Sequence, residues 1–175
     1  IPDDQIGWYK FAVEEGRKII DREGIDLIIS TSPPETAHLI GRALKKVFNI
    51  PWVADLRDLW AEDHFRDRPF IKRLALRHME KRVLKDADMV ITVSEPWART
   101  LRSSLGAGRD KVEVIENGFD EEDFGKAVYG KNKKFTISYT GKLHGRRQPV
   151  DVFFKVLKDL IDEKTAPSFL GLTRT

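Results

Sequence analysis

The order in which apolar and amphipathic segments follow one another constrains the fold of this chain most strongly. Short β-branched, apolar runs alternate with longer segments of helical periodicity. Strands are predicted at 25–30, 51–56, 87–94 and 111–118, and helices at 7–24, 35–49, 69–85 and 95–106. The strands are apolar on both faces, as strands of a parallel sheet usually are. The alternation therefore predicts an α/β fold, a parallel sheet with helices on both faces.

A change of character after residue 118 indicates a second unit. The stretch 119–134 is polar, contains two glycines and ends in a basic cluster, which is typical of a linker. A strand at 135–141 and a helix at 150–163 are predicted beyond it. One strand and one helix cannot form a domain, so we expect the chain to be a fragment of a longer protein. The predicted organisation is a first domain over 1–126, a linker over 127–134 and a truncated second domain over 135–175.

The composition excludes several classes of protein. Hydrophobic residues make up 41% of the 175 residues, which favours a folded core over disorder. The absence of cysteine excludes disulfides and thiolate metal sites and fits a reducing, cytoplasmic location. The net charge of +3 is too mild to predict a nucleic-acid partner. No apolar run approaches the ~20 residues that cross a bilayer.

Polar residues follow each predicted strand of the first domain. In open α/β sheets, ligands bind beyond the carboxyl ends of the strands, so we predict that these residues line a cleft. The candidates are Ser32, Asp55, Arg57, Asp58, Trp60, Ser94, Glu95 and Asn117. Two carboxylates flanking a guanidinium could orient a polyhydroxylated ligand through charge-assisted hydrogen bonds.

Each candidate also has a purely structural interpretation. Asp55, Arg57 and Asp58 could form a local salt bridge at the end of a strand, with Trp60 packed in the core. Thr31 or Ser32 could bind a ligand, or could instead serve turn formation and helix capping. His38 lies within a predicted helix and fits a packed or exposed helix residue better than a catalytic base.

The loop after residue 140 carries the clearest signal for anion binding. Gly141 directly follows the predicted strand, which lets the backbone approach a ligand closely. Lys142, Arg146 and Arg147 add cationic groups, and a helix begins near Pro149 with partial positive charge at its N-terminus. Phosphate fits this pattern, although a basic surface loop would look the same.

The predicted helix at 69–85 presents a basic stripe. Arg73, Arg77, Lys81 and Lys85 recur at four-residue steps. Such a stripe could attract an anionic membrane surface, with ~1 kcal/mol per charge. The alternative is a solvated face whose charges pair with the neighbouring Glu80 and Asp86.

Several sequence motifs together resemble one enzyme family. In chain order they are "IGWYKFAVEEG", "DLIISTSPPETAHLIG", "IPWVADLRDLW", "ADMVITVSEPWARTL", "KVEVIENGFDEEDF" and "ISYTGKLHGRRQPVDVF". They resemble family-four (group 1) glycosyltransferases, whose GT-B fold has two Rossmann-like domains facing across a cleft. The resemblance extends to about residue 161, and "NGFDEEDF" followed by "YTGKL" is its most specific part.

The resemblance implies a division of labour between the two domains. The first domain would bind a glycan or lipid-linked acceptor and the second a nucleotide-sugar donor, whose diphosphate would contact Gly141, Lys142 and Arg147. Transfer would proceed with retention of configuration, without a metal or other cofactor, in cell-surface polysaccharide biosynthesis. Departing diphosphate charge is stabilised by preorganised cations in such a reaction.

The sequence departs from the family pattern in ways that affect function. The first strand and glycine-rich loop of the acceptor domain are missing, and so is the late acidic pair that grips the donor. We therefore expect these 175 residues alone to be inactive. Lys142 replaces the more usual arginine, keeping the charge but losing the bidentate fork.

Two further interpretations remain at the level of sequence. The chain could be a non-catalytic Rossmann-like binding module that retains the motifs as scaffold. A truncated sheet also leaves open edges, which could pair two copies into a homodimer. Peripheral attachment to the inner face of a membrane is compatible with the enzyme interpretation, because many acceptors are lipid-linked.

Overall fold

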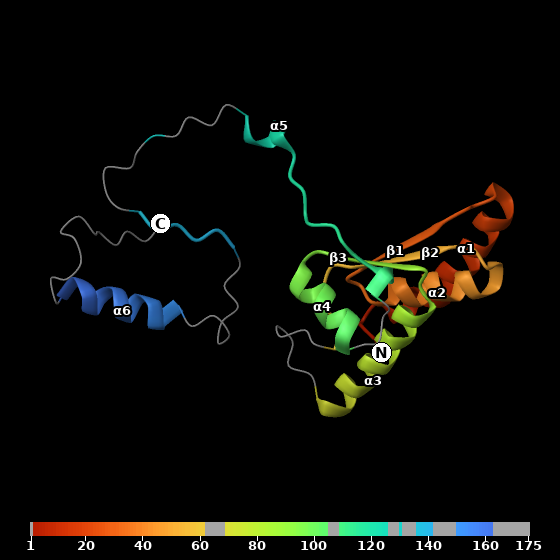
Figure 1. Ribbon diagram of the computed structural model, residues 1–175, viewed down its shortest axis with the longest axis horizontal. Helices are drawn as coiled ribbons and strands as arrows, with labels where there is room; N and C mark the ends of the chain where they lie inside the picture. The colour runs from red at the N-terminus through yellow and green to blue at the C-terminus, as the bar shows by residue number, and fades with distance from the viewer. Residues whose placement is uncertain are drawn as a thin grey trace. The chain divides into compact units, whose positions relative to one another are not determined.

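The computed structural model describes residues 2–61, 69–104, 109–125, 130, 136–141 and 150–162. The chain divides into two compact units, Ile1–Gly118 and Phe119–Thr175 (Figure 1). We call them the first and second units and describe each by itself. The assignment of an acceptor-binding and a donor-binding role to separate domains stays a prediction.

The first unit is an α/β structure built on a parallel sheet. Its elements are η1 (Ile6–Trp8), α1 (Tyr9–Glu23), β1 (Ile28–Ser32), α2 (Thr36–Phe48), β2 (Trp52–Leu56), α3 (Phe70–Asp86), β3 (Met89–Thr92), α4 (Glu95–Ser104), η2 (Arg109–Lys111) and β4 (Val112–Val114). The four strands pair in parallel in the order β1-β2-β3-β4. The predicted α/β class and Rossmann-like parallel sheet flanked by helices are confirmed.

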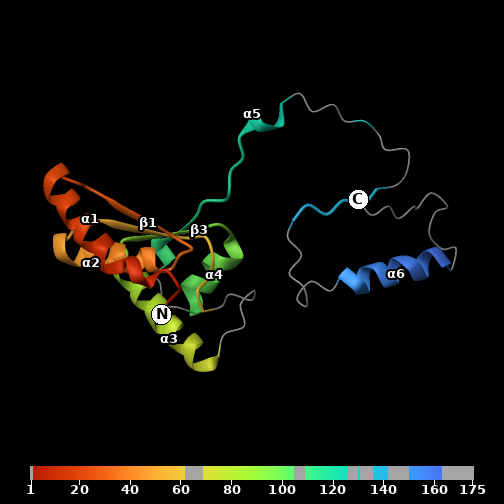
Figure 2. The same ribbon diagram turned by 180° about the vertical axis from the view of Figure 1, so that it is seen from behind.

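Helices α2, α3 and α4 cover one face of the sheet, whereas the sequence predicted helices on both. Helices α2, α3 and α4 lie on the same side of the strands in both views of the long axis (Figures 1 and 2). On the opposite face Ile29 is 66% and Met89 40% exposed. The strand order explains this arrangement. Each crossover is expected to be right-handed and each steps to the next strand in the same direction, so successive helices fall on one side.

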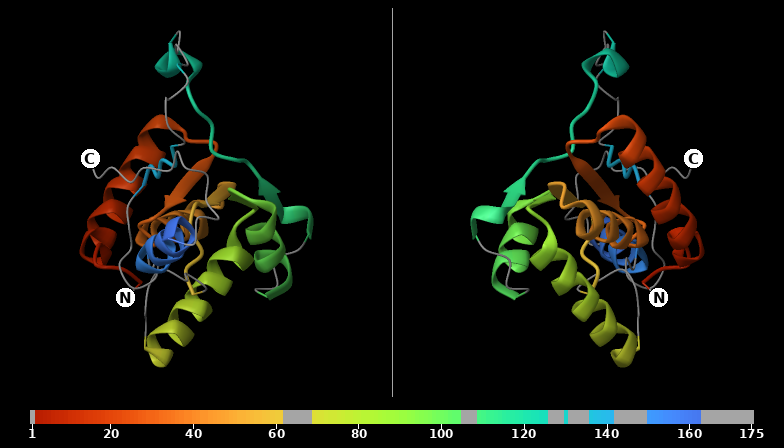
Figure 3. Two further views of the ribbon diagram at one scale, coloured as in Figure 1. Left: turned by 90° about the vertical axis from the view of Figure 1, so that its left-hand side faces the viewer. Right: turned by 90° about the vertical axis from the view of Figure 1, so that its right-hand side faces the viewer.

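The core lies between this sheet face and its helices. Trp52, Ala54 and Leu56 of β2 are fully buried, and so is Val90 of β3. They pack with a set of equally buried helix residues: Val83, Leu84, Ala98 and Leu101. A smaller cluster joins α1 to α2 through Ile20, Ile40 and Leu44, and the end-on views show α1 beside the sheet at the β1 edge (Figure 3).

Helix boundaries follow local signals, while the first strand is displaced from its predicted position. Helix α1 ends at Gly24 with φ 64°, a left-handed conformation that glycine adopts without strain. Strand β1 runs over Ile28–Ser32 instead of the predicted 25–30. The difference arises because Ser30 and Ser32, which the sequence pattern assigns to a strand end and a turn, have buried partners on α2.

Helix α3 contacts the core through one face, and some of its apolar residues lie outside that face. Its buried residues are Leu76, Glu80, Val83 and Leu84. Ile71 and Leu74 are instead 81% and 60% exposed. Arg77 of the predicted basic stripe is half-buried, and the predicted partner Asp86 pairs with Arg42 of α2 at 2.6 Å.

Ion pairs fix α2 to the end of α3 and to the connection between α3 and β3. Arg42 and Lys46 both contact Asp86, and Lys45 pairs with Asp88, which also accepts a hydrogen bond from Trp52 N at 2.7 Å. Partial burial raises the pKa of Asp86, but hydrogen bonds from the two basic residues outweigh it and lower the pKa. Asp88 has a lowered pKa chiefly because Lys45 donates to it.

The second unit contains two described helices, α5 (Glu121–Phe124) and α6 (Val150–Asp162). Asp120 caps α5 by accepting a hydrogen bond from Glu122 N. Helix α6 confirms the prediction, but the strand predicted at 135–141 is wrong, since residues 136–140 adopt no regular structure. A strand needs a paired neighbour to be stable. Leu157 of α6 is buried, whereas Val152, Phe153, Val156 and Leu160 are exposed.

Replacing Gly41 with alanine tests the close packing of α2 on the sheet. A Cβ at this position would lie 2.6 Å from Trp52 Nε1 and 3.1 Å from Ser30 Oγ, and the buried indole is rigid. We expect Gly41→Ala to lower the free energy of unfolding by ~1–3 kcal/mol, as overpacking does. Urea denaturation measures this change.

Gly16→Ala on α1 is the matched control. Its Cβ would meet only the flexible end of Leu44, 2.8 Å away. The gain in helix propensity of ~1 kcal/mol should offset the small shift of that side chain. Equal losses in the two variants would contradict the packing described.

Candidate functional site

Three of the predicted rim residues meet at the carboxyl edge of the sheet. The register pairs Thr31 of β1 with Asp55 of β2, so their side chains lie on the same face. Thr31 Oγ1 donates to Asp55 Oδ2 at 2.9 Å, and Arg57 Nε donates to the same oxygen at 3.0 Å. Arg57 Nη1 donates to Asn117 Oδ1, beyond β4. We call these four residues the Arg57 cluster.

Arg57 is held in place yet keeps donors available. Its backbone N–H donates to Ser32 O at 3.1 Å, which fixes the chain as it leaves β2. The side chain is 38% exposed. A guanidinium carries five N–H donors, and the bonds to Asp55 and Asn117 use two of them. The arrangement therefore presents a preorganised cation at the rim, suited to hydroxyl or anionic oxygen atoms.

Asp55 combines ion pairing with an unsatisfied oxygen. Its side chain is 13% exposed, and Oδ2 accepts both hydrogen bonds from the cluster. Within the described residues, Oδ1 is buried and has no hydrogen-bond partner. A buried polar atom without a partner costs free energy, and such atoms often mark functional sites.

A buried histidine connects the cluster to the core. His38 of α2 is fully buried, with Nδ1 2.7 Å from Ser30 Oγ and Nε2 2.9 Å from Ser32 Oγ. Trp52 Nε1 donates to Ser30 Oγ at 2.8 Å. We call His38, Ser30, Ser32 and Trp52 the His38 network. A neutral imidazole suits it, because one ring nitrogen donates while the other accepts.

The segment after β2 is packed against this histidine. The ring of Trp60 stacks on His38 with centroids 5.7 Å apart and planes at 17°. The backbone N–H of Trp60 donates to Oε1 of Glu80, a fully buried residue of α3, at 3.0 Å. The segment that follows β2 and contains Arg57 is thus fixed to the core at Trp60.

Burial controls the charge of His38. It lowers the pKa of His38 to about 4, although the nearby Asp55 carboxylate acts in the opposite direction. The imidazole is therefore neutral at physiological pH. Its role in this structure is to orient two hydroxyl groups.

The other predicted rim residues lie in different environments. Trp60 is 1% exposed and belongs to the core, as its structural interpretation held. Ser32 is buried with its hydroxyl directed at His38. Asp58 is exposed. Ser94 accepts Ala98 N through its carbonyl at the start of α4, and Glu95 pairs with Arg102 at 3.0 Å.

Most of the predicted diphosphate site lies outside the described residues. Gly141 is exposed in the second unit. Lys142 and Arg147 lie outside the described residues.

Sequence reasoning missed the His38 network and the role of Glu80. One signal was present, since Ser30 and Ser32 are two residues apart and must share a face of the strand. The partner of that face could not be read from the sequence, because helical periodicity alone does not orient α2 over β1. Glu80 was interpreted only as a nearby partner for the charges of a solvated helix face, whereas it is buried and accepts a hydrogen bond from Trp60 N.

Comparison with known proteins identifies the family. Residues 3–118, well over half of the chain, match the family model described as a glycosyl transferase 4-like domain. The chain belongs to this glycosyltransferase family. No curated protein gives a significant match. The matched region of the glycosyltransferase contains both the Arg57 cluster and the His38 network.

The described part of the glycosyltransferase has neither a helix suited to span a membrane nor a group of side chains suited to hold a metal ion. None of its helices is both long and apolar enough to cross a membrane. In the same residues, no group of three or more His, Asp or Glu side chains is arranged to hold a metal ion.

The neutral state of His38 predicts a pH-dependent stability. Unfolding restores an ordinary histidine pKa near 6.5, whereas the folded value is about 4. As pH falls from 7 to 5, the unfolded chain takes up this proton first, so the free energy of unfolding should drop by ~2 kcal/mol from this group. Urea denaturation at a series of pH values measures the slope.

Variants at two histidines separate this effect from other titrations. His38→Gln should lower stability at neutral pH and flatten the slope between pH 7 and 5. His78→Gln, at an exposed position on α3, should keep the parent slope. A parent slope that persists in His38→Gln would show that another group is responsible.

Proposed function

We propose that this glycosyltransferase domain belongs to an enzyme that transfers a sugar from a nucleotide-sugar donor to a glycan or lipid-linked acceptor. The observation that supports a role for the first unit is the Arg57 cluster. It places a fixed guanidinium and a partly unsatisfied carboxylate at the carboxyl edge of a parallel sheet, where α/β enzymes bind ligands. We propose that Arg57, Asp55 and Asp58 face the acceptor or the sugar being transferred.

The proposed reaction makes and breaks one bond to the anomeric carbon. The bond between that carbon and the diphosphate oxygen breaks, and the nucleoside diphosphate leaves with the bonding electrons. An acceptor hydroxyl oxygen forms the new glycosidic bond and loses its proton. Positive charge near the reacting atoms stabilises the departing anion. We propose Lys142 and Arg147 for the diphosphate, and transfer with retention and without a metal in cell-surface polysaccharide assembly.

Arginine variants in the full-length protein test the two assignments separately. Arg57→Ala should lower kcat/KM for the acceptor by on the order of 10²-fold, as the loss of a preorganised donor does. Arg57→Lys should recover only part of the loss, because it lacks the planar fork. Arg147→Ala should weaken donor binding far more than acceptor binding in calorimetric titrations.

Arg99→Ala is the control, because Arg99 is exposed on α4 and makes none of the hydrogen bonds of the cluster. It should leave kinetics unchanged. Equal loss of donor and acceptor binding in Arg147→Ala would reject its role. A full-length protein that neither transfers nor hydrolyses any sugar nucleotide would favour the non-catalytic module.

A second property is suggested by the start of α3. Phe70, Ile71 and Leu74 are 71%, 81% and 60% exposed, and the exposed Lys72 and Arg73 lie among them. Apolar residues next to basic ones are the combination that binds an anionic membrane surface. We propose that this turn attaches the protein peripherally at the cytoplasmic face of a membrane.

Vesicle sedimentation tests the attachment. Charge reversal of Lys72 and Arg73 to Glu should weaken binding to phosphatidylserine-containing vesicles at least about tenfold, since each charge contributes ~1 kcal/mol. Raised salt should have a similar effect. Lys10→Glu, at an exposed position of α1, serves as control. Binding that ignores both charge and salt would refute the attachment.

A further inference from the structure

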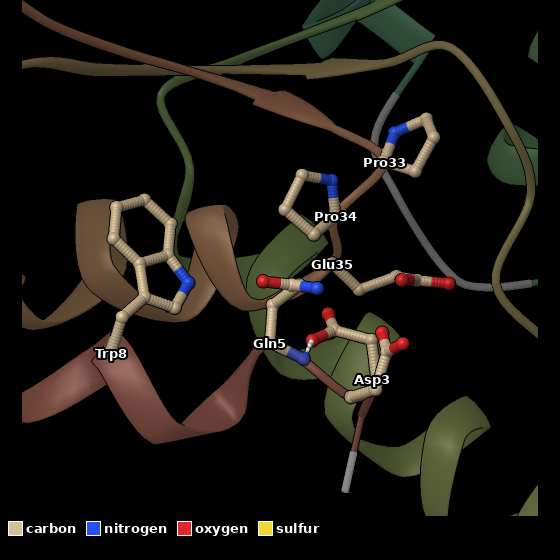
Figure 4. Close-up of a pocket in the computed structure, with 7 residues that line it drawn as sticks. Asp3, Gln5, Trp8, Pro33, Pro34 and Glu35 are labelled. Carbon is tan, nitrogen blue, oxygen red and sulfur yellow. Dashed lines mark hydrogen bonds between the residues drawn. The ribbon is translucent and has the colours of Figure 1, made fainter.

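A pocket of about 540 Å³ lies beside the end of β1, in the range of small-molecule sites (Figure 4). It is formed by two segments of the first unit. Asp3, Asp4, Gln5 and Trp8 come from the N-terminal segment, and Pro33, Pro34 and Glu35 from the β1–α2 connection. None of these residues was singled out as a site by the sequence.

Hydrogen bonds to Asp3 hold the two segments together. Its Oδ2 accepts from Thr36 N at 2.6 Å and its Oδ1 from Thr36 Oγ1 at 2.7 Å, so Asp3 caps α2 from a distant part of the chain. Oδ1 also accepts from Gln5 N at 2.8 Å. Partial burial raises the pKa of Asp3, but the bonds from Thr36 and Gln5 outweigh it and lower the pKa. The acceptor capacity of this carboxylate is thus largely used, and its role is to shape the pocket.

The rest of the lining combines the indole ring of Trp8 with polar groups. Trp8 is 46% exposed, an unusual position for so large an aromatic ring. Gln5 stands between Trp8 on one side and Asp3 and Glu35 on the other (Figure 4). The amide of Gln5 both donates and accepts, and the exposed Asp4 accepts. A sugar ring matches this lining, because its C–H face packs on indole and its hydroxyls bind amide and carboxylate groups.

The charge of the lining selects among sugars. Three of the seven lining residues are acidic and none is basic. A diphosphate or a uronic acid would meet repulsion there, while an uncharged sugar would not. The lining therefore fits the acceptor side of a transfer reaction better than the donor side.

We propose that this pocket is a subsite for an uncharged sugar of the acceptor, with Trp8 as its stacking platform. The inference rests on the proposed transferase function and adds a location and a substrate class to it. The pocket is also connected to the Arg57 cluster through the backbone. Pro33 follows Ser32, whose carbonyl accepts from Arg57 N at 3.1 Å.

Nuclear magnetic resonance titration of the 175-residue chain tests binding directly. The probes are methyl glucoside, methyl galactoside and methyl N-acetylglucosaminide, with glucuronic acid as the charged comparison. At least one neutral glycoside should shift the Trp8 indole N–H, and glucuronic acid should not. Trp8→Ala should weaken the binding about tenfold, the ratio that corresponds to an aromatic contact of ~1.4 kcal/mol.

Phe11→Ala is the matched control, because Phe11 is 75% exposed on α1, which follows η1 directly, but does not line the pocket. It should bind the glycoside like the parent chain. Failure of every glycoside to shift Trp8, equal binding of glucuronic acid, or equal loss in Phe11→Ala would overturn the subsite.

Kinetics of the full-length protein distinguish this inference from the function on which it rests. Trp8→Ala should raise the acceptor KM and leave the donor KM unchanged. Normal acceptor kinetics in Trp8→Ala would overturn the subsite and leave the transferase function intact. Absence of transfer in the parent protein would instead overturn the transferase function. If the pocket still bound glycosides in that case, its role as an acceptor site would be overturned as well.

Discussion

The bridge that His38 makes between two serines of β1 is the interaction on which the rest of the first unit depends. Ser30 and Ser32 point into the core, where unpaired hydroxyls would cost free energy. A neutral imidazole from α2 meets both, and the Trp52 indole donates to Ser30 from the next strand. This network fixes the register of α2 over β1 and β2. It also explains why Gly41 is needed where α2 approaches the Trp52 indole.

The same network holds the residues at the rim of the sheet in position. Trp60 stacks on His38, and Ser32 O binds the backbone of Arg57. The guanidinium is then set by Asp55 and Asn117. A site assembled this way needs little reorganisation when charge develops in a reaction, which is the property that electrostatic catalysis requires. The rim residues are thus held in place by the buried contacts of His38 and Ser32.

Two surfaces of the first unit differ in electrostatic character. The Arg57 cluster offers cationic N–H donors, whereas the pocket at Trp8 is lined by acidic and aromatic groups. In the proposed reaction, an anionic donor and an uncharged sugar of the acceptor would bind the same protein. Opposite local charges would keep the two substrates from exchanging positions, since an unfavourable charge contact discriminates against the wrong ligand.

The sequence by itself determined the α/β alternation, the parallel sheet and the end of α1 at Gly24. It also placed Asp55, Arg57 and Asn117 at one edge, because parallel strands share a direction. Only the tertiary structure decided which side chains are buried and which distant residues are in contact. Arg57 and Asn117 are 60 residues apart, and Asp3 caps a helix 33 residues away. Periodicity reports on one element at a time, so it could not show that Trp60 and Ser32 are buried, that α2, α3 and α4 share one face of the sheet, or that Trp8 borders a pocket.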